Sequence, residues 1–206
     1  MKNIGEFSAD GYGMSIISTD LFTEYLKNKR CRAKKILSYF DKNKELFFDS
    51  IRAGRFLPFY KIPSFQYSIF LSIDEQATEL PVDYDVVFRY NNFYLEVGGL
   101  GKACIARLNY LEYQFEDIKQ NLVEKENIIP SGPEGVLEKY YPVKGFEIRQ
   151  GIYEFDLIGL ERKERIERES KNYAYAFVFR KNENAKNDNL EKADNDNFDF
   201  SPISKP

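Results

Sequence analysis

The sequence predicts an α+β fold, mainly an antiparallel β-sandwich or sheet, with N-terminal helices and one mid-chain helix. Three observations predict this class. About eight to ten short segments are rich in Phe, Tyr, Ile and Val, and turn-forming residues separate them. Helical periodicity is confined to the first quarter of the chain and to residues 109–126. The strand-like segments lie too close together for the helix that each parallel crossover requires.

The first quarter of the chain is expected to hold one strand followed by helices. Residues 12–18, YGMSIIS, have the composition of a short strand. Thr19 or Asp20 can cap a helix whose apolar residues recur on one face. A second helical stretch covers about residues 33–53, and we expect Asp41 to interrupt it as a new cap.

The remainder of the chain is expected to be mostly strands. FLPFYKI, QYSIFLSI, DYDVVFRY and FYLEVGG come first, and Asn91-Asn92 between the last two predicts a tight hairpin, since Asn tolerates positive φ. KACIARL follows, and residues 109–126 then carry a helical pattern that Asn109 can cap and that Pro130 ends. VLEKYYPV, GFEIRQ, GIYEFDLIGL and YAYAFVFR supply four more strands.

Residues 1–181 are expected to form a single domain, and residues 182–206 a polar, disordered tail. Of the 206 residues, 43% are apolar and 16% aromatic, which suffices for a sizeable core. The last 25 residues are rich in Asn, Asp and Lys and contain few apolar side chains. Phe198, Phe200 and Ile203 are the residues that could dock this tail onto the domain.

The chain contains no histidine. This excludes Ser-His and Cys-His nucleophile pairs, histidine-ligated metals and the usual general base near neutral pH. Catalysis would have to rest on carboxylates, Lys, Tyr or Cys. We therefore expect a protein that is not an enzyme and that uses no cofactor.

The sequence favours a cytoplasmic location. Cys31 and Cys104 are the only cysteines, too few for a disulfide framework. The first residues lack the apolar segment of a signal peptide, and no apolar run approaches the roughly 18 residues that span a bilayer. We expect no association with membranes.

A glycine-rich stretch, NNFYLEVGGLGKACI at residues 91–105, is the nearest approach to a catalytic motif. A phosphate-binding loop needs four residues between its glycines and a Ser or Thr after the lysine, whereas Ala103 follows Lys102 here. The residues after Lys102 are strand-like, so no helix N-terminus is available to hold an anion. We interpret Gly98, Gly99 and Gly101 as a turn between strands.

A basic run, KNKRCRAKK at residues 27–35, allows two interpretations. It could contact a phosphate backbone, and Cys31 within it could be a reactive thiolate. Alternatively it is a solvated helix end, where positive charge is favourable. No aromatic residue lies among the basic ones, so stacking on bases is unsupported and a nucleic-acid partner is not expected.

An acidic region in the middle of the chain supplies the candidate partner-binding residues. Residues 61–160 contain 9 Lys/Arg and 16 Asp/Glu, a net charge of 9 − 16 = −7. The candidates are Asp74, Glu75, Glu79, Asp83, Asp85 and Glu96. Such carboxylates could also hold Mg²⁺, but the Glu-x-Lys element of restriction-type nucleases is missing, because Gly98 stands where the lysine belongs. They could equally be edge charges that prevent strands from pairing with other chains.

The order of a strand, capped helices, AGRFLPFYKI, hairpin strands and QGIYEFDLIGL resembles a loose group of bacterial β-rich domains. Some of these are thought to be immunity proteins encoded beside toxin genes. The resemblance covers the layout of roughly residues 10–180 and no specific motif. It therefore implies a role but no functional residue.

These observations lead to one main hypothesis and two alternatives. The main hypothesis is a non-enzymatic, cytosolic protein-binding domain, in the form of an immunity protein that covers a basic toxin surface with its acidic region. One alternative is a small-ligand-binding β-sandwich with a Tyr- and Phe-lined pocket. The other is a carboxylate-dependent metal hydrolase.

Overall fold

The structure is a computed structural model that describes residues 1–74, 79–113, 116, 124–131, 136–167, 171–190 and 199–203. Its elements in chain order are β1 (Lys2–Ser8), β2 (Met14–Ser18), α1 (Thr19–Asn28), α2 (Ile36–Lys42), α3 (Lys44–Arg52), β3 (Phe56–Phe59), β4 (Gln66–Ile73), β5 (Tyr84–Val97), β6 (Lys102–Arg107), α4 (Tyr110–Tyr113), β7 (Glu124–Ser131), β8 (Val136–Glu147), β9 (Gly151–Arg162) and β10 (Tyr173–Lys181). The predicted α+β class, rich in antiparallel sheet, is confirmed.

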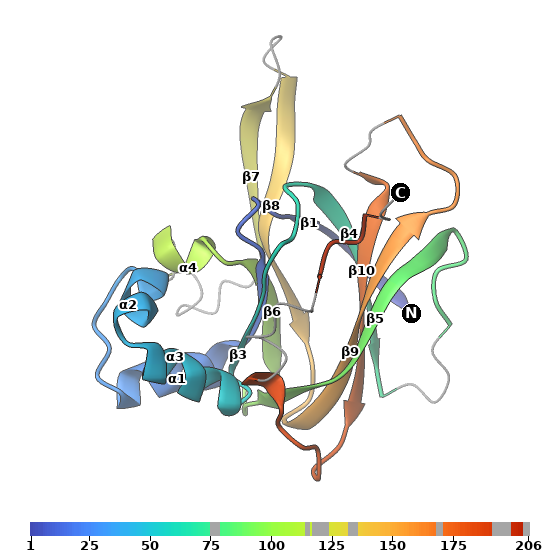
Figure 1. The fold of residues 1–206 in the computed structure, drawn as a ribbon. Helices are drawn as coiled ribbons and strands as arrows, with labels where there is room; N and C mark the ends of the chain where they lie inside the picture. The colour runs from blue at the N-terminus through green and yellow to red at the C-terminus, as the bar shows by residue number, and fades with distance from the viewer. Residues whose placement is uncertain are drawn as a thin grey trace.

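The strands form two five-stranded sheets. Sheet I has the order β1-β4-β10-β9-β5, and sheet II has the order β3-β2-β6-β8-β7. Every pairing is antiparallel except that of β4 with β10, two strands about a hundred residues apart in the chain. Figure 1 shows sheet II between sheet I on one side and helices α1, α2 and α3 on the other.

The main core lies between the two sheets and continues under the helices. In β9 and β10 alternate residues point into it and are almost fully buried: Tyr153, Phe155, Leu157, Tyr173, Tyr175, Phe177 and Phe179. Their rings pack on one another, as with Phe155 and Phe179, whose centroids are 4.9 Å apart. Burial of each such side chain stabilises the fold by about 1.5–3 kcal/mol, so the sandwich is held mainly by aromatic packing.

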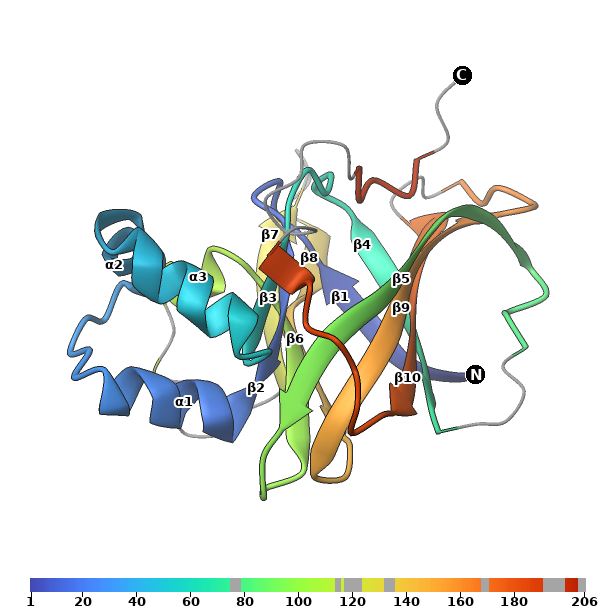
Figure 2. The same ribbon diagram turned by 60° about the horizontal axis from the view of Figure 1, so that its bottom comes forward.

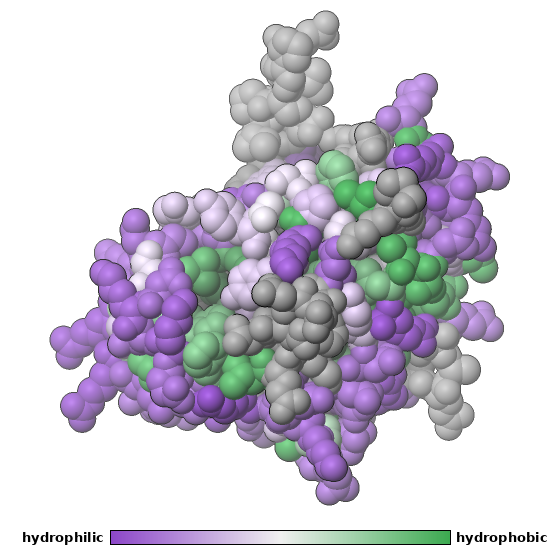
Figure 3. All heavy atoms as spheres, in the orientation of Figure 1, coloured by the Kyte–Doolittle hydropathy of each residue, from purple (hydrophilic) through white to green (hydrophobic). Residues whose placement is uncertain are grey.

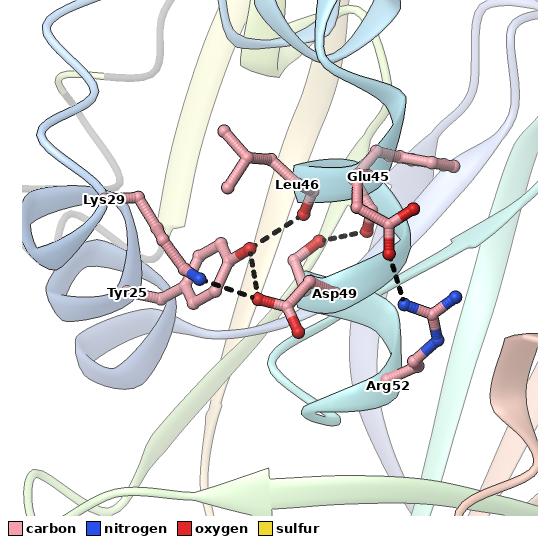
Figure 4. Close-up of polar contacts among 8 residues, drawn as sticks. Tyr25, Lys29, Glu45, Leu46, Asp49 and Arg52 are labelled. Carbon is pink, nitrogen blue, oxygen red and sulfur yellow. Dashed lines mark hydrogen bonds and ion pairs between the residues drawn. The ribbon is translucent and has the colours of Figure 1, made fainter.

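A polar network joins α1 to α3, and Figure 4 shows it in close-up. The Tyr25 hydroxyl donates to the Leu46 carbonyl at 2.8 Å and lies 3.1 Å from the Asp49 carboxylate, while Lys29 Nζ lies 3.0 Å from the same carboxylate. The hydrogen bond from Lys29, together with that from Tyr25, holds the pKa of Asp49 below its ordinary value. Burial and the Asp49 charge raise the pKa of Tyr25. The network fixes the two helices over sheet II.

The helices begin and end close to the predicted positions. The predicted first helix is α1, and the predicted second stretch is the pair α2 and α3. The break falls at Asn43 instead of Asp41: Asn43 has φ −133°, and its side-chain amide donates to the Tyr39 carbonyl at 2.8 Å. No helix among the described residues is long and apolar enough to cross a membrane.

The hairpin predicted at Asn91-Asn92 does not form. Both residues lie inside β5, a single strand of 14 residues that pairs with β9 along its length. The register shifts between Tyr90 and Phe93, and Asn92 has φ 61° with its N–H 3.3 Å from Asp156 Oδ1. The tolerance of Asn for positive φ therefore produces a bulge in one strand and not a turn between two.

The helix predicted over residues 109–126 does not reach its predicted end. Tyr110–Tyr113 form α4 and Glu116 is also helical, whereas residues 124–126 belong to β7, which pairs with β8. Pro130 lies within β7, at the edge of sheet II, where its missing N–H costs no ladder bond to a further strand. The residues between these two elements lie largely outside the described part.

The sequence favours a disordered tail after residue 181, yet its described residues pack against the domain. Phe200 is buried between the sheets, and Asn189 is fully buried. Figure 2 shows the chain after β10 crossing in front of β5 towards β3 and the helices. Phe200, one of the predicted docking residues, thus does dock, because the open side of the sandwich offers it an aromatic cage. Phe198 lies outside the described residues.

Candidate binding site

The structure separates the six acidic candidates. Because Tyr84 pairs with Arg162 and Val97 with Gly151, the two ends of β5 lie at opposite ends of sheet I. Asp83 and Asp85 lie at one end, and Glu96 lies at the other. At roughly 3.3 Å per residue, Asp85 and Glu96 are on the order of 30 Å apart. Asp74 directly follows β4 and lies at the Glu96 end.

The separated carboxylates also have basic neighbours. The Asp83 carbonyl accepts a hydrogen bond from the Lys163 N–H at 3.0 Å, and Asp83 shares a surface pocket with Arg162 and Arg165. Glu96 lies 3.6 Å from Arg55 Nε. Glu79 is exposed in the loop that precedes β5, and Glu75 lies outside the described residues. The five described candidates therefore do not form one acidic surface.

Asp74 lies in a pocket of about 600 Å³ at the end of the sandwich, here called the Tyr153 pocket. Its lining residues come from the ends of β4, β8 and β9 and from the turn before β6: Ile73, Asp74, Leu100, Gly101, Glu147, Ile148, Arg149 and Tyr153. Leu100 is 55% exposed on the rim, whereas Tyr153 is fully buried in the wall. The pocket thus combines apolar walls with three charged side chains and one phenol.

The backbone holds Asp74 in a fixed position. Its φ of 53° is the left-handed conformation that Asp tolerates better than most residues. Its N–H donates to the Phe179 carbonyl at 2.9 Å, and its Oδ1 accepts the Lys181 N–H at 2.6 Å. These bonds tie the carboxylate to the end of β10 and leave its second oxygen without a partner among the described residues.

The Tyr153 hydroxyl is the unusual feature of this pocket. It is shielded from solvent and has no hydrogen-bond partner in the part of the chain that the structure describes. Burial raises the pKa of Tyr153, the carboxylates of Asp74 and Glu183 raise it further, and the guanidinium of Arg149 lowers it. Leaving a buried hydroxyl unpaired costs about 1–3 kcal/mol, so the fold retains an unfavourable group at the wall of a pocket.

A second pocket, of about 630 Å³, adjoins the first one and shares Ile73 and Glu147 with it. It runs along the side of the sandwich where β1 and β4 of sheet I approach β8 of sheet II. Its lining consists of Lys2, Asn3, Ile4, Leu71, Ile73, Lys144, Gly145, Phe146 and Glu147. We call the two pockets together the furrow.

Charged side chains of both signs line the furrow. Lys2 and Lys144 line one pocket, Asp74 and Arg149 line the other, and Glu147 lines both. Within the described part of the chain, Glu147 and Arg149 form no ion pair, in contrast to pairs such as Lys29–Asp49 and Arg52–Glu45 on the helices. The Glu147 carboxylate, where the two pockets meet, is therefore suited to a cation.

The other sequence features have structural roles. The glycine-rich stretch is a turn between β5 and β6, as interpreted: Gly98 packs against the Asp20 carboxylate, which also accepts the Leu100 N–H at 3.0 Å. The basic run 27–35 connects α1 to α2, with Lys29 paired to Asp49 and Lys35 above the Tyr113 ring. Within the part that the structure describes, no three Cys, Asp or Glu residues are placed to hold a metal ion.

Comparison with known proteins found no matching family model, no matching curated protein and no matching solved structure.

Sequence reasoning identified Asp74 but missed Glu147, Arg149 and Tyr153. Tyr153 stands in GIYEFDLIGL, where alternation with Phe155 and Leu157 marks it as a core residue, and it is indeed buried. Nothing in the sequence distinguishes its unpaired hydroxyl from a paired one. The adjacent segments GFEIRQ and GIYEF indicate a turn near residue 150, and this is the only signal that could have directed attention there.

Proposed function

We propose that this chain is a non-catalytic protein-binding domain that receives a Lys or Arg side chain of its partner in the Tyr153 pocket. The observation that carries the proposal is a pocket lined by the Asp74 and Glu147 carboxylates, with the buried Tyr153 hydroxyl, which has no hydrogen-bond partner among the described residues, in its wall. An ammonium or guanidinium group in the pocket would neutralise the carboxylates, and it would donate to the Tyr153 hydroxyl once a small movement of the ring turns this shielded group towards the pocket. Such charge-assisted hydrogen bonds are about twice as strong as neutral ones.

The length of the furrow supports a protein segment as the occupant. The two adjoining pockets offer room beyond a single side chain, and their linings carry both basic and acidic side chains. A partner segment that contains a basic residue with acidic neighbours would complement both. Complementarity of this kind selects partners and raises association rates without any catalytic group. An immunity protein that covers a basic toxin surface, the role implied by the layout resemblance, would use its furrow in this way.

The small-ligand alternative has weaker support. The aromatic side chains between the sheets pack on one another: Phe59 contacts Phe93 directly, and Phe200 packs against both. An aromatic-lined surface pocket near Tyr12 and Tyr60 measures about 230 Å³, below the roughly 300–1,000 Å³ of typical ligand sites. The metal-hydrolase alternative has no supporting cluster among the described residues.

Binding of short random peptides to the immobilised chain tests the proposal. Selected peptides are expected to contain Lys or Arg flanked by acidic residues. Glu147→Lys should weaken their binding at least roughly tenfold through charge repulsion, and Tyr153→Phe by about three- to tenfold through loss of one hydrogen bond. Fluorescence anisotropy with a labelled selected peptide measures both effects.

The control is Glu164→Lys, which makes the same charge change on an exposed residue beyond the far end of β9. It should bind the peptides like the unmodified chain. Tyr153→Phe should also leave the free energy of unfolding unchanged or raise it by up to about 1 kcal/mol, because no hydrogen bond is lost within the chain. Peptides without basic residues, or equal binding by the Glu147→Lys and Glu164→Lys chains, would refute the proposal.

A further inference from the structure

The open side of the sandwich between β3 and β5 is closed by the C-terminal segment Asp199–Ile203. These two strands are the edges of sheet II and sheet I, respectively. Phe200 is 3% exposed, and its ring lies 5.0 Å from that of Phe59 in β3 and 5.4 Å from that of Tyr90 in β5, measured between centroids. The segment therefore inserts one aromatic side chain into a cage that both sheets build.

The sheets recognise the main chain of this segment through tyrosine hydroxyls. The Tyr175 hydroxyl donates to the Phe200 carbonyl at 2.7 Å in a fully buried contact. The Tyr90 hydroxyl donates to the Asp199 carbonyl and accepts the Asp199 N–H, both at 3.1 Å. Because these bonds go to backbone groups, any extended peptide with an aromatic residue at this position could make them.

A second anchor lies closer to β10. The Asn189 amide pairs with the exposed edge of β5: its Oδ1 accepts the Tyr94 N–H at 2.8 Å, and its Nδ2 donates to the Tyr94 carbonyl at 2.6 Å. One side chain thus occupies the hydrogen-bonding positions that an added strand would fill. Together the two anchors cover a strand edge and an aromatic cage, the two elements by which sheets bind extended peptides.

We propose that the cage formed by Phe59, Tyr90 and Tyr175, with the adjacent edge of β5, is a peptide-binding site that the chain occupies with its own C-terminal segment. The external ligand that fits this site is a peptide presenting one aromatic side chain. The intervening sequence after β10 is rich in Asn, Asp and Lys, so attachment of the segment depends on its few anchors. This site is independent of the furrow, and its occupant differs in chemistry from the basic partner proposed there.

The C-terminal segment is covalently attached to the domain, so it competes strongly with any external peptide for this site. A covalently attached segment acts at a high effective concentration, on the order of millimolar for short linkers, so an external peptide must compete with it. A substitution of Phe200 in the chain should release its own segment from the site. An added peptide with the natural sequence keeps its phenylalanine and can then bind there. Binding of an external peptide therefore shows whether the C-terminal segment can be displaced or is an integral part of the core.

The test uses a fluorescent peptide with the sequence of residues 182–203 and the full-length chain carrying Phe200→Ala or Phe200→Leu. We expect Phe200→Ala to bind this peptide at least roughly tenfold more tightly than the unmodified chain, with Phe200→Leu in between. A peptide with Phe200→Ala should bind none of the chains. Circular dichroism and cooperative urea unfolding establish that each chain is folded.

Two results would overturn the proposal. One is a folded Phe200→Ala chain that fails to bind the peptide, since the vacated cage would then not accept an external segment. The other is loss of cooperative folding in Phe200→Ala, because a displaceable segment must leave the remaining domain intact. Hydrogen exchange of the unmodified chain gives an independent readout: amides of residues 199–203 should exchange through local opening, faster than those of β9 and β10.

Discussion

Gly13→Ala is expected to lower the free energy of unfolding by about 3 kcal/mol or more. Gly13 has φ 116°, and a Cβ atom at this position would lie 2.1 Å from the Phe59 carbonyl oxygen. The clash involves backbone on both sides, because Met14 pairs with Phe59 and the Gly13 carbonyl accepts the Leu108 N–H at 3.1 Å. Relief would require β2 to move away from β3 or β6.

Gly99→Ala is the matched control for this substitution. A Cβ atom at Gly99 meets only Gln150 Oε1, at 4.0 Å, in a turn without positive φ at that residue. Its effect should stay within about 0.5 kcal/mol. Urea unfolding followed by circular dichroism measures both variants. Equal stability of the two would show that the close approach of β2 and β3 at Gly13 is not present in solution.

The two cysteines are expected to differ in thiol reactivity by at least two orders of magnitude. Cys104 is fully buried in β6, and burial raises its pKa to about 12, so its thiolate fraction at pH 8 is on the order of 10⁻⁴. Cys31 is half-buried between α1 and α2. A chromogenic disulfide reagent should therefore titrate one thiol promptly in the native chain and the second only when urea unfolds it.

Cys31→Ser controls this measurement, because it should abolish the prompt reaction and leave the slow one. Even at pH 9 the raised pKa keeps the thiolate fraction of Cys104 on the order of 10⁻³, so raising the pH from 7 to 9 should not turn the slow thiol of the native chain into a promptly reacting one. Two promptly reacting thiols in the folded chain would contradict the burial of β6 between its neighbours.

The fold was predictable where local pattern decides the outcome. Phe22, Tyr25 and Leu26 share one face of α1, and alternation in GIYEFDLIGL marks the buried face of β9. The prediction of strands and turns failed where pairing with a distant segment of the chain determines the structure. Asn91-Asn92 stays inside β5 because β9 pairs with residues on both sides of it, and the parallel partner of β4 lies about a hundred residues later in the chain.

The candidate site was predictable only in part, for a related reason. Asp74 belongs to an acidic stretch of sequence, but the loop that follows it carries Asp83 and Asp85 to the opposite end of sheet I. Its actual neighbours, Glu147 and Tyr153, come from a different hairpin. The acidic residues were grouped because they are close in the sequence, whereas the sheet topology separates them. The sequence also does not show which buried hydroxyl lacks a hydrogen-bond partner.

Site-specific photo-crosslinking in the cell of origin tests the central claim most directly. A photoreactive amino acid replaces Leu100, on the rim of the Tyr153 pocket, or Ile166, an exposed apolar residue beyond the other end of β9. The proposal predicts a covalent protein adduct from position 100 only, and its disappearance when Glu147→Lys is added. Adducts of equal yield from both positions, or an adduct from position 100 that survives Glu147→Lys, would contradict a partner bound through this pocket.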